Sequence, residues 1–353
     1  MLIGQRGFIS IITTNTICQG DTRLASFDVL YTQGAIINFA MSSVKWPGVA
    51  NLNVSLFSIF KGKWELNYFL NGRKVDFISQ YISDESTQSE PEIILDNKEK
   101  VYNGSYYLGD GFVINEYERG VYIDQSKKNE DVIFELLIGN DVNESYNHSP
   151  SNYIINFFDW PLTKASEYIG PFLRIKELVK PFREVNKRAV YREKWWMYGE
   201  RRVGLYESIN KIDYCFVITA TTKYVNLVRQ KTDKIFAKSL YVFAIENFSK
   251  FLILQSNVHE LWTRKFSSTL GDTLSYTPST CFDTFPFPIN VGMDQEIVHE
   301  IIGKAYHEYR RQLLLYLKLG LTKAYNAFHA KEITAATANL QGFQNVSIQP
   351  DTY

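Results

Sequence analysis

A run of cations interleaved with aromatic residues is the part of this sequence best suited to binding a charged partner. From Arg174 to Arg202, ten lysines and arginines stand against four glutamates, a net charge of +6, and the run includes Trp195 and Trp196. Cations in such a run neutralise nucleic-acid phosphates and set the register of a duplex. The candidates for contact with DNA are Arg183, Lys187, Arg188, Arg192, Arg201 and Arg202.

The same run also fits an ordinary solvated helix face with Trp195 and Trp196 in the core. Overall charge does not decide between the two, because 38 cations balance 38 carboxylates. The charge is uneven, however: the stretch from Asp84 to Glu144 is strongly acidic, and the acidic segment from Asp84 to Glu92 would repel phosphates. Both interpretations of the basic run stay open at this point.

The elements that must position this run are predicted from hydrophobic spacing. Three apolar runs near the start of the chain predict strands, the first of them buried as in a parallel sheet. Apolar residues at helical spacing predict three helices. The predicted strands are 8–12, 36–40, 52–60, 153–161 and 214–220, and the predicted helices are 163–179, 251–266 and 295–320.

A short extended segment follows the helix predicted at 251–266. Small residues at 267–272 form a turn, and prolines then alternate with phenylalanines, which favours an extended and aromatic-anchored chain. Its most distinctive residues are Tyr276, Phe282, Phe285, Pro286, Phe287 and Pro288. Composition alone favours a loop that plugs the core.

This segment, LQSNVHELWTRKFSSTLGDTLSYTPSTCFDTFPFP, resembles the end of the target-recognition region of large adenine-specific DNA methyltransferases, including single-chain type IIG restriction-modification enzymes. The words GFIS, TTNTICQGDTR and SSVKWPGVANLNVSLFSIFKG resemble the part that follows the catalytic tetrapeptide in the same family. The resemblance implies that Trp46 stacks on the adenine swung out of the duplex. A tryptophan that simply packs on the sheet is the alternative.

The family resemblance also shows what this sequence lacks. No Asn-Pro-Pro-Tyr or Asn-Pro-Pro-Phe tetrapeptide occurs in the chain, and in this family that motif orients the adenine amine at the methyl group. The glycines of 108–112 are a poor substitute for the family's cofactor loop. The full-length family uses S-adenosylmethionine, but we expect none to bind this chain alone and expect no methyl transfer by it.

The expected fold class is α/β in the mixed α+β sense: the tail of a class I methyltransferase sheet, an α+β target-recognition domain and C-terminal helices. Residues 1–83 are assigned to the catalytic sheet and 84–100 to a linker. Residues 101–290 are assigned to target recognition, 291–330 to a helical segment and 331–353 to an atypical tail.

The expected partners are duplex DNA and, in a second hypothesis, a separately encoded catalytic half with which the chain acts in trans as a specificity module. The three scattered cysteines indicate a reducing cytoplasm, with neither a disulfide framework nor a zinc site. No apolar run approaches the ~18 residues of a membrane span. A third hypothesis, a secreted carbohydrate-binding β-sandwich, is disfavoured by the predicted helices.

Overall fold

The computed structural model describes residues 4–18, 20–49, 53–85, 91–270, 273–289 and 291–329. The chain divides into two compact units that alternate along the sequence. Unit 1 comprises 1–98, 221–224 and 257–287, and unit 2 comprises 99–220, 225–256 and 288–353. The segment 257–287, which we expected within the recognition domain, therefore groups with the N-terminal residues. The tail at 331–353 and part of the expected linker, 86–90, lie outside the described residues.

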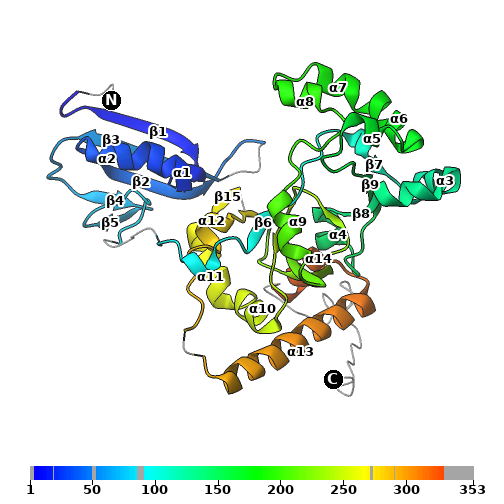
Figure 1. Ribbon diagram of the computed structural model, residues 1–353. Helices are drawn as coiled ribbons and strands as arrows, with labels where there is room; N and C mark the ends of the chain where they lie inside the picture. Colours follow the sequence, from blue (N-terminus) through cyan, green and yellow to red (C-terminus); the bar gives the residue numbers. More distant parts are fainter. Residues whose placement is uncertain are drawn as a thin grey trace. The chain divides into compact units, whose positions relative to one another are not determined.

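Unit 1 contains a five-stranded sheet of order β1-β3-β2-β4-β5 (Figure 1). Its strands are β1 (Phe8–Thr14), β2 (Ala35–Lys45), β3 (Asn53–Lys61), β4 (Tyr68–Leu70) and β5 (Arg73–Val75). A continuous helical stretch joins β1 to β2, made of α1 (Gly20–Arg23), η2 (Leu24–Asp28) and α2 (Val29–Thr32). Phe27 from this stretch packs on Ile37 and Phe57 of the sheet, which forms the core of the unit.

The first strand differs from its prediction. It was expected to be buried as in a parallel sheet, but β1 pairs antiparallel with β3, and Phe8 and Ile12 are more than half exposed. β1 ends the strand order of its sheet, so it has a single neighbour among the described strands. An apolar, β-branched run does not distinguish a central strand from an edge strand.

The remaining part of unit 1 carries the extended segment. It contains α11 (Asn257–Phe266), α12 (Pro278–Cys281) and a three-stranded sheet of order β11-β16-β15, formed by β11 (Thr221–Thr222), β15 (Ser268–Leu270) and β16 (Thr273–Ser275). The single helix predicted at 251–266 is wrong, because α10 (Phe248–Leu254) ends before α11 begins. At the break, the Ser256 hydroxyl donates to the Ile253 carbonyl at 2.6 Å, the kind of local bond that competes with helix.

Unit 2 is built on two four-stranded sheets, of order β12-β10-β14-β6 and β13-β8-β9-β7. The first contains β6 (Val101–Asn103), β10 (Tyr214–Thr219), β12 (Val228–Lys231) and β14 (Leu240–Phe243). The second contains β7 (Val113–Ile114), β8 (Ile133–Leu137), β9 (Asn152–Ile155) and β13 (Ile235–Phe236). The strand predicted at 214–220 is confirmed and almost wholly buried. The strand predicted at 153–161 ends early, at Ile155.

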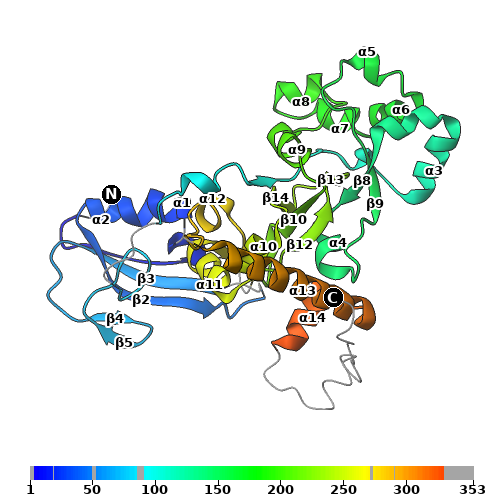
Figure 2. The ribbon, with the colours of Figure 1, turned by 60° about the horizontal axis from the view of Figure 1, so that its bottom comes forward.

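Helices surround these sheets (Figure 2). They are α3 (Glu116–Gln125), α4 (Gly139–Glu144), α5 (Leu162–Ala165), α6 (Ile169–Leu178), α7 (Lys180–Glu184), α8 (Ala189–Glu193), α9 (Val203–Ile209), α10, α13 (Met293–Leu317) and α14 (Leu321–Phe328). The helix predicted at 163–179 is interrupted between α5 and α6, whereas that predicted at 295–320 is confirmed as α13. The mixture of helices and sheets confirms the expected mixed fold class. No described helix is long and apolar enough to cross a membrane.

Candidate nucleic-acid interface

The basic run passes through α6, α7 and α8 of unit 2 and is held in place by one buried arginine. Arg183 is fully buried, and its Nε donates to the Leu108 carbonyl at 2.9 Å. Its Nη1 donates to the carbonyls of Met197 at 2.6 Å and Lys194 at 3.3 Å, and its Nη2 donates to that of Tyr107. The run is thereby tied to the segment around Leu108.

Arg183 was expected to contact DNA, and this is wrong. Burial lowers the pKa of its guanidinium to about 10, and the donor groups point at main-chain carbonyls instead of solvent. The sequence held a signal for this. Ile175 and Val179, both fully buried, precede Arg183 at intervals of four, so the arginine continues their inward face.

Three of the other candidates form an exposed cationic surface. Lys187, Arg188 and Arg192 are exposed, and within the part of the chain that the structure describes none of them forms an ion pair with a carboxylate. Arg188 Nη1 donates to the Tyr191 hydroxyl at 3.0 Å, and Arg192 Nη1 donates to the Asn186 carbonyl at 2.6 Å. Their positive charge is therefore not neutralised locally. We call these three residues the cationic surface.

The last two candidates are partly neutralised. Arg201 is half-buried and lies 3.5 Å from an Asp159 carboxylate oxygen, and the exposed Arg202 pairs with Glu200. Exposed pairs of this kind contribute little to stability, ~0–1 kcal/mol, so they can exchange partners. These two arginines attract phosphate less strongly than the cationic surface does.

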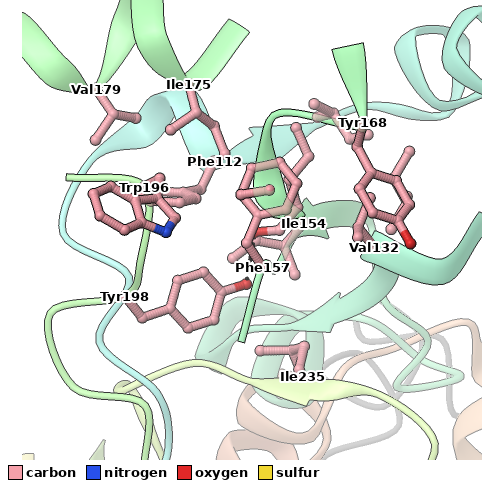
Figure 3. Packing of buried hydrophobic residues seen from close by; sticks show 14 of the residues in the cluster. Phe112, Val132, Ile154, Phe157, Tyr168, Ile175, Val179, Trp196, Tyr198 and Ile235 are labelled. Carbon is pink, nitrogen blue, oxygen red and sulfur yellow. Dashed lines mark hydrogen bonds between the residues drawn. The ribbon is translucent and has the colours of Figure 1, made fainter. Parts of the chain in front are cut away.

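The two adjacent tryptophans belong to the core of unit 2, and Figure 3 labels Trp196 within it. Trp195 and Trp196 are 7% and 9% exposed, and the Trp196 indole donates to the Trp160 carbonyl at 2.9 Å. Tyr198 packs against Phe112 in the same cluster. The core alternative is therefore confirmed for the tryptophans, while the cations beside them face outward.

A cleft of about 850 Å³ in unit 2 was not anticipated from the sequence. Its walls come from the segments 106–111, 138–140 and 237–239 and from α6 and α7, so Phe182 of the basic run lines it. The exposed Lys238 lies over the Tyr106 ring, with its Nζ 4.2 Å from the ring centroid. Asn140 and Ser239 add groups that can donate and accept hydrogen bonds. Its mixture of aromatic, cationic and amide groups suits nucleic acid.

Trp46 lies in unit 1, just after the end of β2. Its side chain is 39% exposed, and a Cβ placed on Gly48 would collide with its indole nitrogen. Glycine at position 48 therefore leaves space for the ring to fold back over the turn. The ring remains accessible for stacking, which stays a prediction.

The aromatic segment of unit 1 is a structural element. Tyr276, Phe282 and Phe285 are at most 1% exposed, whereas Pro286 is exposed and Phe287 is half-buried. Pro288, also exposed, is the first residue of the following part of unit 2. The buried Asn97 donates from its amide to the carbonyls of Phe282 at 3.0 Å and Phe285 at 2.8 Å. The segment thus fills the interior of unit 1, as composition alone favoured.

The glycines at 109 and 111 do not suit a cofactor loop. A Cβ on Gly111 would lie 2.6 Å from Leu178 Cβ, and one on Gly109 would lie 3.1 Å from Val179. Both glycines allow close packing on α6 and the residue after it. Gly111 lies within a short 3₁₀ turn, Asp110–Phe112, that leads into β7 and not into an α-helix. These residues do not fit S-adenosylmethionine, for which a glycine turn leading into a helix is typical.

Comparison with known proteins places this geometry in context. Residues 94–289 match the family described as "MmeI, target recognition domain". DNA methyltransferase A of Bacillus subtilis (strain 168) is 22% identical over 307 residues, which cover 79% of this chain and 32% of that protein. The type IIL restriction-modification enzyme MmeI, solved in complex with DNA, aligns with a TM-score of 0.73 at 17% identity, over 95% of this chain and 45% of that chain.

The chain thus spans about a third of the length of the curated relative and less than half of the MmeI chain. The type IIG restriction endonuclease BpuSI aligns with a TM-score of 0.33 only. The family match runs from residue 94 to residue 289. It therefore includes the residues of unit 2 from 99 to 256 and the segment 257–287 of unit 1. More than half of the residues are covered, and the chain belongs to the MmeI target recognition domain family.

Proposed function

We propose that this chain is the DNA-recognition portion of a site-specific adenine-N6 DNA methyltransferase of the restriction-modification kind. The observation that carries the proposal is the cationic surface of Lys187, Arg188 and Arg192, whose charges face solvent without carboxylate partners among the described residues. The buried Arg183 holds the run that carries this surface, and Phe182 of the same run lines the cleft. Phosphate contacts made there would position the duplex, and groups in the cleft would meet its base edges.

The full-length activity that we propose is transfer of a methyl group from S-adenosylmethionine to adenine in duplex DNA. The family membership and the likeness to a methyltransferase support this. The isolated chain is proposed to bind DNA without methylating it, since it contains no Asn-Pro-Pro-Tyr or Asn-Pro-Pro-Phe tetrapeptide. Incubation with duplex DNA and labelled S-adenosylmethionine tests this, and label transferred by the isolated chain would refute it.

Fluorescence anisotropy with a labelled duplex at low salt tests the binding surface. The triple variant Lys187→Gln, Arg188→Gln and Arg192→Gln is expected to bind at least tenfold more weakly, because three phosphate contacts are lost. A matched control removes the same charge from α13 and α14 through Lys304→Gln, Arg311→Gln and Lys323→Gln, all exposed cations. Equal losses in the two triples would show that net charge alone matters, and the assigned surface would be wrong.

A second candidate function is that of a specificity module acting in trans with a separate catalytic half. The edge position of β1 among the described strands favours it, because Phe8, Ile9 and Ile12 are between 40% and 59% exposed on a strand that ends the order of its sheet. An unpaired strand edge is a template for another strand. Co-expression with an upstream methyltransferase half tests the idea. A stable complex that methylates DNA supports it, and separate elution without activity would eliminate it.

A further inference from the structure

A second cavity in unit 2, of about 420 Å³, lies apart from the cleft described above and shares none of its lining residues. Its walls include Phe134, Phe158, Tyr198 and Ile235, and its polar lining includes Asn156, Asp159, Arg201, Glu207 and Asn210. Tyr198 and Ile235 appear near the lower edge of the same core in Figure 3. The volume lies within the ~300–1,000 Å³ typical of pockets for small ligands.

Asn156 supplies an unused hydrogen-bond donor to this cavity. The residue is 7% exposed, and its Oδ1 accepts the Phe158 main-chain N–H at 2.9 Å. This bond fixes which side-chain atom is oxygen, so the remaining atom is the amide nitrogen. Nδ2 has no hydrogen-bond partner in the described parts of the chain, and Asn156 lines the cavity. The fully enclosed unpaired polar atoms of the described residues do not include Asn156 Nδ2, so solvent reaches this amide and it can donate to a ligand that displaces water from the cavity.

The same turn presents an aromatic ring. Phe158 has a φ of 52°, a left-handed backbone that is unusual for a bulky residue, and the Asn156 bond holds its main chain there. Its ring is 36% exposed and meets those of Phe134 and Trp160 at centroid distances of 5.6 and 5.2 Å. The turn therefore keeps a large apolar ring at the surface of the cavity instead of in the core.

Carboxylates outnumber cations around the cavity, with Asp159, Asp233, Glu135 and Glu207 against Arg201 and Lys234. Arg201 pairs with Asp159, and the buried Lys234 lies 3.1 Å from Asp233 and 3.5 Å from Glu135. Glu207 adds one further carboxylate to the lining. A phosphate would gain little from such surroundings, whereas a neutral flat ring could stack, accept from an amide and donate to a carboxylate.

We propose that this cavity receives an unpaired nucleobase, with Asn156 Nδ2 donating to a ring nitrogen or carbonyl and Phe158 supplying the stacking surface. The inference rests on the proposed function, because Arg201 of the basic run lines the cavity and would bring the DNA backbone close to it. It adds a base-binding site within the recognition region itself, separate from Trp46 in unit 1.

The test uses the full chain and three probes. These are a fully paired duplex, the same duplex with 2-aminopurine opposite an abasic site, and the free 2-aminopurine nucleoside. The wild-type chain is expected to bind the duplex with the unpaired base at least fivefold more tightly than the paired one, since stacking contributes ~1–3 kcal/mol per base. Quenching of 2-aminopurine emission is expected on binding.

Three variants locate the effect. Asn156→Asp keeps an oxygen for the Phe158 N–H but removes the donor, and it is expected to abolish the preference for the unpaired base. Phe158→Asn tolerates the left-handed backbone and removes the ring, so it should abolish quenching. Asn326→Asp places the same charge on an exposed residue of α14 that does not line the cavity, and it should leave the preference intact. Circular dichroism verifies that each variant is folded.

The outcomes separate this inference from the proposed function. Equal binding of both duplexes by the wild type without quenching would overturn the cavity assignment while DNA binding stands. Equal losses in Asn156→Asp and Asn326→Asp would do the same. Absence of binding to every duplex would instead refute the proposed function. If the free nucleoside binds tightly and Asn156→Asp abolishes that binding, the cavity recognises a base, and its ligand is a free nucleoside and not a base within DNA.

Discussion

Replacement of the buried Arg183 by methionine is expected to release the basic run from the rest of unit 2. Methionine keeps an unbranched apolar side chain but has no donor. Arg183 donates to four main-chain carbonyls. Within the described loops and turns, three of them accept no hydrogen bond from a main-chain N–H, so they depend on Arg183: those of Tyr107, Leu108 and Met197. The fourth, at Lys194, also accepts from the Met197 N–H.

An orphaned buried acceptor costs ~1–3 kcal/mol, so three of them give at least about 3 kcal/mol. Removal of a buried charge returns part of that cost, and we therefore expect unit 2 to lose about 3 kcal/mol and not the upper limit. Arg192→Met is the matched control. Arg192 also donates to carbonyls, but it is exposed, and a surface change of this kind costs less than ~0.5 kcal/mol.

Denaturant unfolding followed by tryptophan fluorescence measures the difference, because Trp195 and Trp196 lie within the run that Arg183 holds. Hydrogen exchange over residues 180–198 should rise in Arg183→Met, and duplex binding should weaken although the cationic surface itself is unchanged. An Arg183→Met protein within about 1 kcal/mol of the wild type, with unchanged exchange, would refute the anchoring role.

Three further predictions follow from single contacts. Burial, together with the charge of Arg310, lowers the pKa of both His148 and His307 to about 4. Below about pH 6.5 the unfolded chain takes up a proton on each histidine, and the folded chain does not until about pH 4. The free energy of unfolding should therefore fall between pH 6.5 and 4, by up to about 3 kcal/mol for each histidine. A urea midpoint that stays constant over that range would contradict this. Gly303→Ala should destabilise unit 2 by about 1–3 kcal/mol in denaturant unfolding, because the added Cβ would collide with a main-chain carbonyl of α10. An unchanged denaturation midpoint would show that α13 can shift to relieve the collision. Trp46→Ala, joined to a working upstream half, should lose most methyl transfer to duplex DNA, and full turnover would dismiss the stacking role.

Sequence reasoning succeeded where hydrophobic spacing was strong and local. Residues 214–219 form the predicted strand, and their continuous apolar run is almost wholly buried. Residues 293–317 form the predicted helix, although Ile297 and Ile301 of its apolar face are exposed. Sequence reasoning failed at the break between α10 and α11, where Gln255 bonds to the Leu227 N–H at 3.0 Å and the Val225 carbonyl at 2.8 Å. Those tertiary contacts hold Gln255 next to the boundary between the units, which lies after Ser256.

The candidate site shows the same limit. The exposure of Lys187 and Arg192 matches the pattern of a charged run, but Arg183 was misjudged because its charge concealed its place on the inward face of α6 and α7. The cavity around Asn156 could not be predicted. Its walls join residues between 134 and 235, and an unused amide donor is recognised only when all neighbours of the side chain are known.

The salt dependence of duplex binding by the intact chain tests the central claim most directly. The logarithm of the binding constant should fall linearly with the logarithm of salt concentration, with a slope of about −0.9 per phosphate contact. Neutralising Lys187, Arg188 and Arg192 should reduce the magnitude of this slope by about 2.7, three times 0.9. A chain that does not bind duplex DNA at low salt, or a triple variant with the wild-type slope, would contradict the account.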